Sequence, residues 1–191
     1  MKAFHSDPKI KDYYLQRVRS HAAADEIAKG QYVGKGKNGK PQMCAVGCTI
    51  HGSDHSAYER ELGIPQILAR LEDRIFENLP EDLMKTWPDR FLSAITVGTD
   101  LSKVWPKFAI FLLIDPTQCA SRHPQCDVVA TAYQQSLDGV KIDWRSVRSA
   151  DAVTPKGGLM VPASPIGRPW YVDYLQTVLE AVKVREVLDD E

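Results

Sequence analysis

The sequence lacks a long apolar run and a leader-like N-terminus. The nearest candidate for a membrane span, Phe108 to Ile114, is far shorter than the roughly 20 residues that a spanning helix needs. The N-terminal segment MKAFHSDPKIKDYY has no apolar core, and Asp7 and Asp12 stand where a signal peptide carries no acid. We therefore expect a cytoplasmic protein without a membrane segment, whose four cysteines stay reduced.

The sequence also has little net charge. The formal charge is −1 at pH 7, so the chain as a whole is not built to collect nucleic acid or another polyanion. The charges are unevenly spread, because residues 1–40 hold nine Lys and Arg against four Asp and Glu, whereas residues 41–100 hold five against ten. Two interpretations stay open: the two segments face each other or are simply solvated, or the basic segment meets an acidic partner.

What the sequence does contain is typical of an ordinary globular protein, with 43% hydrophobic and 26% charged residues. Helix signals dominate, and several come from proline, which suits a first helical turn. The expected helices begin at Pro8, Pro65, Pro88 and Pro106, cover 127–137 and 140–153, and begin again at Trp170. The sequence therefore predicts an all-α fold of about seven helices, in a single domain over residues 1–191 with a Gly/Pro-rich internal loop at 154–169.

The helix from Pro65 has the strongest periodicity. Its apolar stripe consists of Ile64, Ile67, Leu68, Leu71 and Ile75. Its charged residues Glu72, Asp73, Arg74 and Glu77 lie largely off that stripe. We therefore expect them to form a solvent-exposed face.

Residues 31–46 are the exception to the helical pattern. Asn38-Gly39 is a strong signal for a two-residue hairpin turn, and Tyr32-Val33 and Met43 to Val46 would supply the paired flanks. The stretch Gly34 to Lys40 also fits a phosphate-binding loop, G-x-x-x-x-G-K. Pro41 follows where a Ser or Thr hydroxyl is needed for magnesium, and so we reject that motif and expect a small hairpin or loop.

The segment CAVGCTIHGSDH brings together the first candidate site residues: Cys44, Cys48, His51 and His55, with Glu59 nearby. On one helix, with spacings of 4, 3 and 4 residues, the four side chains Cys44, Cys48, His51 and His55 would share a face but extend over about 16 Å at 1.5 Å per residue. Four ligands so far apart cannot reach one zinc ion, so on a helix only a pair such as His51 and His55 would chelate it, with the other ligands coming from elsewhere. If the chain instead turns near Gly47, Cys44, Cys48 and His51 would converge on a metal.

A second cluster follows in QCASRHPQC, with Cys119, His123 and Cys126. Two such clusters are the pattern of a split zinc or iron site, although neither has the C-x-x-C spacing of structural zinc sites. The competing interpretation is a core lined by small buried cysteines, with histidines on the surface.

Cys44 or Cys48 would also serve as a catalytic nucleophile if His51 or His55 activated it. No oxyanion hole or substrate pocket is visible in the sequence. The basic residues Arg17, Arg19, Lys35, Lys37 and Lys40 would touch phosphates, but no nucleic-acid recognition motif accompanies them. We interpret them as solvated, and nucleic acid is not an expected partner.

The run GCTIHGSDHSAYERELGIPQILARLEDRIFENLP, continued through Trp87 to Ile95, is similar to an uncharacterised bacterial hypothetical-protein family with no assigned function. The resemblance reaches to about residue 115 and is most specific around CAVGCTIH and LGIP. It implies a bacterial protein and brings no activity, cofactor or catalytic residue.

The sequence thus favours a non-catalytic binding or interaction protein, because no catalytic signature is complete and neighbouring segments differ in charge. The alternative is a metal-dependent enzyme using zinc or iron, or a cysteine-nucleophile enzyme, centred on Cys44 to Glu59. Paired helices with apolar faces also make a homodimer an expected partner arrangement.

Overall fold

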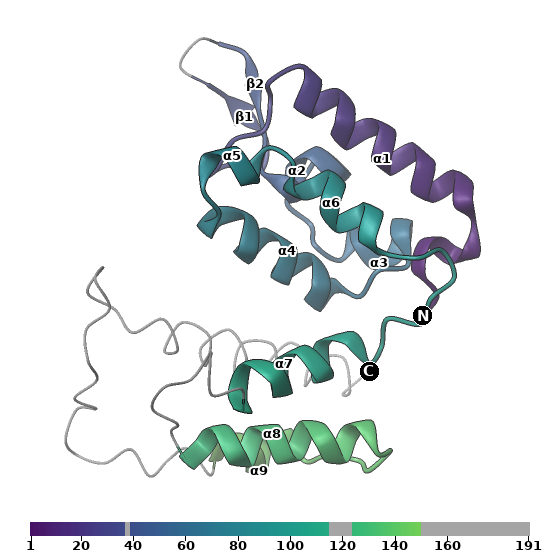
Figure 1. Ribbon diagram of the computed structural model, residues 1–191, viewed down its shortest axis with the longest axis vertical. Helices are drawn as coiled ribbons and strands as arrows, with labels where there is room; N and C mark the ends of the chain where they lie inside the picture. Colours follow the sequence, from purple (N-terminus) through teal and green to yellow (C-terminus); the bar gives the residue numbers. More distant parts are fainter. Residues whose placement is uncertain (37–38, 115–123, 150–191) are drawn as a thin grey trace, which may run out of the picture. The chain divides into compact units, whose positions relative to one another are not determined.

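The computed structural model describes residues 1–36, 39–114 and 124–149 (Figure 1). The described part is mostly helical, with nine α-helices and one small antiparallel sheet, which confirms the expected all-α fold with a hairpin. None of these helices has both the length and the apolar character needed to cross a membrane. The Gly/Pro-rich loop expected at 154–169 and the helix expected from Trp170 lie outside the described residues.

The chain divides into two compact units, Met1–Ser102 and Lys103–Glu191, and each is described by itself. The first contains the 3₁₀ helix η1 (Ala3–Ser6), α1 (Pro8–Ala23), β1 (Gly34–Lys35), β2 (Pro41–Gln42), α2 (Ala45–Ile50), α3 (Ala57–Leu62), α4 (Gln66–Asn78), α5 (Glu81–Met84) and α6 (Trp87–Ala94). The second contains α7 (Val104–Ile114), α8 (Pro124–Leu137) and α9 (Trp144–Ser149). That the whole chain forms a single domain stays a prediction.

The short helix α2 is the centre of the first unit. It packs against α1, α4 and α6, and five of its six residues are buried. α1 in turn packs against α6, where Arg19 Nε lies 2.6 Å from Asp89 Oδ1. This ion pair joins the basic segment 1–40 to the acidic segment 41–100.

The prediction of a solvent-exposed face on α4 is wrong at Glu72. This carboxyl is 0% exposed, because α4 packs against α2, α3 and α6 and is therefore covered on more than one side. The Tyr58 hydroxyl donates to Glu72 Oε2 over 2.5 Å. A polar residue thus occupies the core, satisfied in part by a partner from α3 that periodicity does not reveal.

The hairpin is shorter than expected and lies between the predicted flanks. β1 and β2 pair Gly34 with Gln42 and Lys35 with Pro41, and Gly39 has the positive φ of +75° that the turn signal implied. Met43 forms an isolated parallel bridge with Ile27 instead of extending the hairpin. The hairpin therefore leads directly into α2.

α1 ends earlier than the expected stop at Gly30. The chain leaves the helix at Ala24, and Asp25 takes a left-handed conformation with φ 56°. The following backbone is then held by Met43, which donates to the Glu26 carbonyl and accepts from the Ala28 amide. This early ending brings residues 25–29 alongside β2 and α2.

The two ends of the first unit are joined by backbone hydrogen bonds. Lys2 bridges to Asp100, the Ala3 amide donates to the Thr99 carbonyl over 2.9 Å, and the Gly98 amide donates to the Ala3 carbonyl over 2.8 Å. Residues 98 positions apart in the chain thus form one edge of the unit.

In the second unit, α7 packs against α8, and α9 contacts α8. The buried Trp105 ring donates from Nε1 to the Tyr133 hydroxyl over 2.9 Å, and Tyr133 packs against Trp144 with centroids 4.9 Å apart. α9 starts later than the expected residue 140, because the Asp143 carboxylate caps the amides of Arg145 and Ser146. The core of this unit therefore contains one aromatic side chain from each of the three helices.

Candidate functional site

The two cysteines of the first predicted cluster lie in the core around α2. Cys44 is the N-cap of α2, and its Sγ accepts from the Gly47 amide over 3.5 Å. Cys48 lies one turn later, and its thiol donates to the Met43 carbonyl over 3.6 Å. Both side chains are buried, so α2 presents them to the protein interior.

This environment stabilises the protonated thiols. Burial raises the pKa of Cys44 to about 12, and the Asp73 carboxylate adds to that rise although the Gly47 amide opposes it. Burial likewise raises the pKa of Cys48 well above its usual value. A nucleophilic cysteine needs the thiolate, so these surroundings oppose the cysteine-nucleophile hypothesis.

His51 lies at the opposite end of α2 from Cys44 and pairs with residues of another segment. Its Nε2 is 2.9 Å from His21 Nε2, and the His21 Nδ1 is 2.6 Å from Glu26 Oε2. His21 is in the last turn of α1 and Glu26 follows that helix. Sequence reasoning missed both partners, because their proximity depends on where α1 ends.

His55 and Glu59 take part in two further, separate arrangements. His55 Nε2 is 3.3 Å from Asp73 Oδ2, which also accepts from the Tyr32 hydroxyl over 3.3 Å. Glu59 Oε1 accepts from the Gln66 amide over 2.8 Å, at the start of α4. The structure thus distributes the predicted ligands of the first cluster over different local contacts.

No group of three or more His, Cys, Asp or Glu side chains suited to a metal ion occurs in the described part of the chain. Cys126 is buried in α8, in the second unit. Cys119 and His123 lie outside the described residues. The split zinc or iron site therefore stays a prediction.

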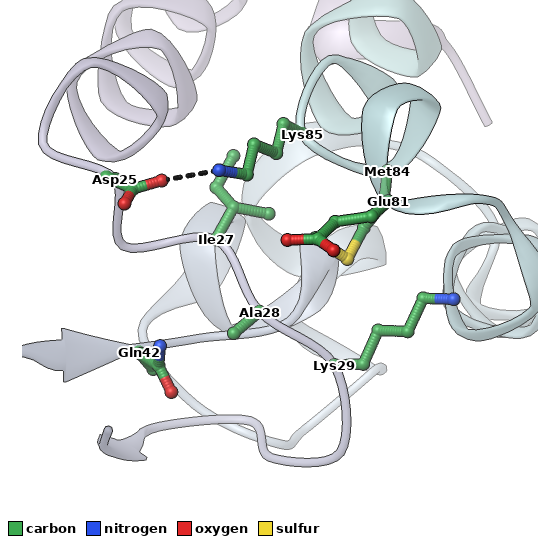
Figure 2. Close-up of a pocket in the computed structure, with 8 residues that line it drawn as sticks. All are labelled: Asp25, Ile27, Ala28, Lys29, Gln42, Glu81, Met84 and Lys85. Atoms are coloured by element: carbon green, nitrogen blue, oxygen red, sulfur yellow. Dashed lines mark hydrogen bonds and ion pairs between the residues drawn. The ribbon is translucent and has the colours of Figure 1, made fainter. Parts of the chain in front are cut away.

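A pocket of about 390 Å³ lies beside α5 in the first unit (Figure 2). We call it the α5 pocket. Its lining comes from the segment after α1, from β2 and from α5, and consists of Asp25, Ile27, Ala28, Lys29, Gln42, Glu81, Met84 and Lys85. Because these segments are far apart in the sequence, no local sequence motif predicts the pocket.

The α5 pocket combines apolar side chains with charges of both signs. Ile27 and Met84 are buried, so they offer an apolar floor. At the rim, Lys85 Nζ lies 2.7 Å from Asp25 Oδ1, and this ion pair lowers the pKa of Asp25 and raises that of Lys85. The two charges therefore offset each other.

The other two charged side chains of the α5 pocket differ in their direction. The Lys29 ammonium donates to the Leu79 carbonyl and points away from the Asp25–Lys85 pair (Figure 2). The Glu81 carboxylate extends from α5 toward Ile27, and it has no hydrogen-bond or ion-pair partner among the residues described (Figure 2). Glu81 is thus an anionic acceptor beside an apolar floor.

Comparisons with models of protein families, with curated proteins and with solved structures find no match to this chain.

Proposed function

We propose that the chain is a non-catalytic binding protein that takes a small organic amine with an apolar body in the α5 pocket. The observation that carries the proposal is the Glu81 carboxylate, which forms no hydrogen bond or ion pair with the described residues, although it attracts the Lys85 ammonium, and which extends toward Ile27 in a pocket of about 390 Å³. Ligand sites of this kind are commonly about 300–1,000 Å³, mostly apolar, with a few polar groups that orient the ligand.

The arrangement of charge favours a cationic ligand over an anionic one. An ammonium group placed at Glu81 gains a charge-assisted hydrogen bond, the stronger class of such bonds. Lys85 already pairs with Asp25, and Lys29 already donates to Leu79, so neither ammonium is free for a ligand carboxylate. The apolar body of the ligand would cover Ile27 and Met84.

The free thiols of Cys44 and Cys48 support placing this binding protein in the reducing cytoplasm. The homodimer expected from the apolar helix faces stays part of the proposal. Sedimentation equilibrium of the purified chain tests it, because a dimer doubles the apparent mass.

The binding proposal is tested with three probes that share one apolar body: isoamylamine, isoamyl alcohol and isocaproate. We expect the amine to bind about fivefold more tightly than the alcohol, the factor that roughly 1 kcal/mol supplies, and isocaproate to bind most weakly. Chemical-shift titrations measure the three affinities and identify the residues that respond.

The variant Glu81→Gln should remove the preference for the amine, because the amide keeps the shape and loses the charge. Asp82→Asn is the matched control, since Asp82 is the next residue of α5 and does not line the α5 pocket. Equal affinity for amine and alcohol in the unaltered protein, or an undiminished preference in Glu81→Gln, contradicts the proposal.

A further inference from the structure

Two histidines and a glutamate, none of which lines the α5 pocket, form a chain of contacts in the first unit. His21 and His51 face each other through their Nε2 atoms at 2.9 Å, with ring centroids 5.1 Å apart and planes at 81°. Glu26 Oε2 lies 2.6 Å from the Nδ1 of His21. We call these three residues the His21–His51 pair and its glutamate.

The short contact between the two Nε2 atoms fixes the protons. A hydrogen bond of 2.9 Å between two ring nitrogens needs one proton between them, since two lone pairs or two N–H groups would repel. Glu26 accepts the Nδ1 proton of His21, so the Nε2 lone pair of a neutral His21 points at His51. Two nitrogen atoms of metal-binding type thus face each other directly.

We propose that His21 and His51 bind a divalent transition-metal ion through their Nε2 atoms, with zinc as the reference ion and water completing its coordination. Two Zn–N bonds of about 2.05 Å at a tetrahedral angle place the nitrogens about 3.3 Å apart. From their present head-on contact, the rings therefore need to separate by a few tenths of an ångström and to turn so that both Nε2 lone pairs point at the ion.

The surroundings of the pair fit this role. A carboxylate that accepts from the second nitrogen of a ligating histidine is the usual outer contact of such sites, and Glu26 provides it. His21 lies in the last turn of the 16-residue helix α1, where the helix dipole favours positive charge. His51 is exposed, so the ion and its water molecules can reach the pair from solvent.

Arg17 is the charge that opposes a bound cation. Its guanidinium is held by the Thr49 carbonyl at 2.8 Å and by the ring of Tyr13, whose centroid is 4.6 Å away. Burial, Arg17 and His21 together lower the pKa of His51, and Glu26 acts in the opposite direction. This lowering favours the neutral imidazole.

Metal binding displaces the proton that lies between the two Nε2 atoms. When both rings are neutral, the Nε2 proton of His51 leaves that atom and Nδ1 of the same ring takes one up, with no net release. When His21 is an imidazolium, its Nε2 proton goes to solvent, and its Nδ1 proton stays on the ring and donates to Glu26. No oxidant, reductant or further reactant takes part.

The backbone of His51 permits a clean test. The residue caps α2 in the left-handed region, with φ 53° and ψ 39°, a conformation that glycine adopts without strain. His51→Gly therefore removes the ligand and also removes the strain of a left-handed backbone conformation at a non-glycine residue. His51→Asn is a second variant, because asparagine also tolerates this region and cannot replace the imidazole nitrogen.

The experiment titrates the full chain with zinc chloride and follows each imidazole by heteronuclear NMR. We expect the ring nitrogens of His21 and His51 to shift together at one zinc per pair, while His5 and His55 do not shift. This site-specific readout separates the pair from any zinc bound by the cysteines. Magnesium chloride, a hard cation that prefers oxygen ligands, should shift neither ring.

The variants decide the assignment. His51→Gly and His51→Asn should abolish the response of His21, and Glu26→Gln should weaken zinc binding by roughly 10–100-fold. His5→Asn and Glu81→Gln should bind zinc as the unaltered protein does, so this result is independent of the amine proposal. Zinc that leaves both rings unshifted, or a His21 response that persists in both His51 variants, overturns the inference.

Discussion

At the scale of single residues, Glu72 controls how stability depends on pH. Its carboxyl is fully buried, Tyr58 donates to Oε2, and Oε1 has no partner among the described residues. Burial raises the pKa of Glu72 to about 8, the negative charge of Asp73 adds to the rise, and the Tyr58 hydrogen bond opposes it. The folded protein therefore holds this proton more tightly than the unfolded chain does.

The sign of the effect follows from that difference. The stabilising contribution of protonated Glu72 is fully present below the unfolded pKa of 4.5, decreases as pH rises, and is lost above the folded pKa of about 8. At roughly 1.4 kcal/mol per pH unit, the loss of unfolding free energy from this group is of the order of 5 kcal/mol. Stability should therefore decline across neutral pH.

Glu72→Gln should flatten this decline, because the amide is neutral at every pH and still accepts from Tyr58. We expect the variant to match the unaltered protein near pH 5 and to be more stable than it at pH 8.5. Urea unfolding at both pH values gives the two free energies. Glu81→Gln, an exposed site, is the control, and a Glu72→Gln profile as steep as that of the unaltered protein would contradict the assignment.

At the scale of elements, α2 depends on a close approach between backbones. A Cβ atom built at Gly47 would lie 1.6 Å from the Tyr32 carbonyl oxygen, which is part of the chain and cannot move aside easily. The Cys44 amide donates to the neighbouring Gln31 carbonyl over 2.8 Å. The helix at the centre of the first unit therefore requires glycine on this side.

Gly47→Ala should destabilise the protein by roughly 3 kcal/mol, the upper part of the range for forcing extra atoms into a packed site. Gly52→Ala is the matched control, because the nearest atom its Cβ would meet within 4 Å is the Ile50 carbonyl oxygen at 4.0 Å. Thermal and urea unfolding of both variants measure the difference. If the two alanine variants had similar unfolding midpoints, the close approach to Tyr32 would not require glycine at position 47.

Element starts were more predictable than element ends and faces. Proline restricts its own backbone locally, and α6 and α7 begin at or next to the predicted Trp-Pro corners. The end of α1 depends instead on Asp25, an ordinary residue in a left-handed conformation fixed by its neighbours. Burial of Glu72 likewise depends on packing against other helices, and the sequence periodicity of α4 does not indicate which helices those are.

The candidate sites were less predictable than the fold, for the same reason. The sequence placed Cys44, Cys48, His51 and His55 together, but α2 directs the cysteines inward and gives each histidine a different partner. His21 and Glu26 come from the end of another helix. Glu81 belongs to a pocket assembled from three separate segments. Contacts between distant segments carry no local sequence signal.

At the scale of the whole molecule, the first unit has a core of its own. Residues from η1 and from all its longer helices are buried in it, among them Phe4, Val18, Tyr58, Phe76 and Leu92. We therefore expect a fragment of residues 1–102 to fold alone with a cooperative unfolding transition. Circular dichroism during urea unfolding tests this, and a fragment without such a transition supports the single-domain prediction instead.

The paired ends of that unit also bear on how it could be shared between proteins. Lys2 and Asp100 lie side by side, and the terminal ammonium group is 3.9 Å from the Asp100 carboxylate. A folded unit whose first and last residues are adjacent can be inserted into a surface loop of another protein without separating the two ends of that loop. The first unit is therefore suited to insertion as a domain, in evolution or in protein engineering.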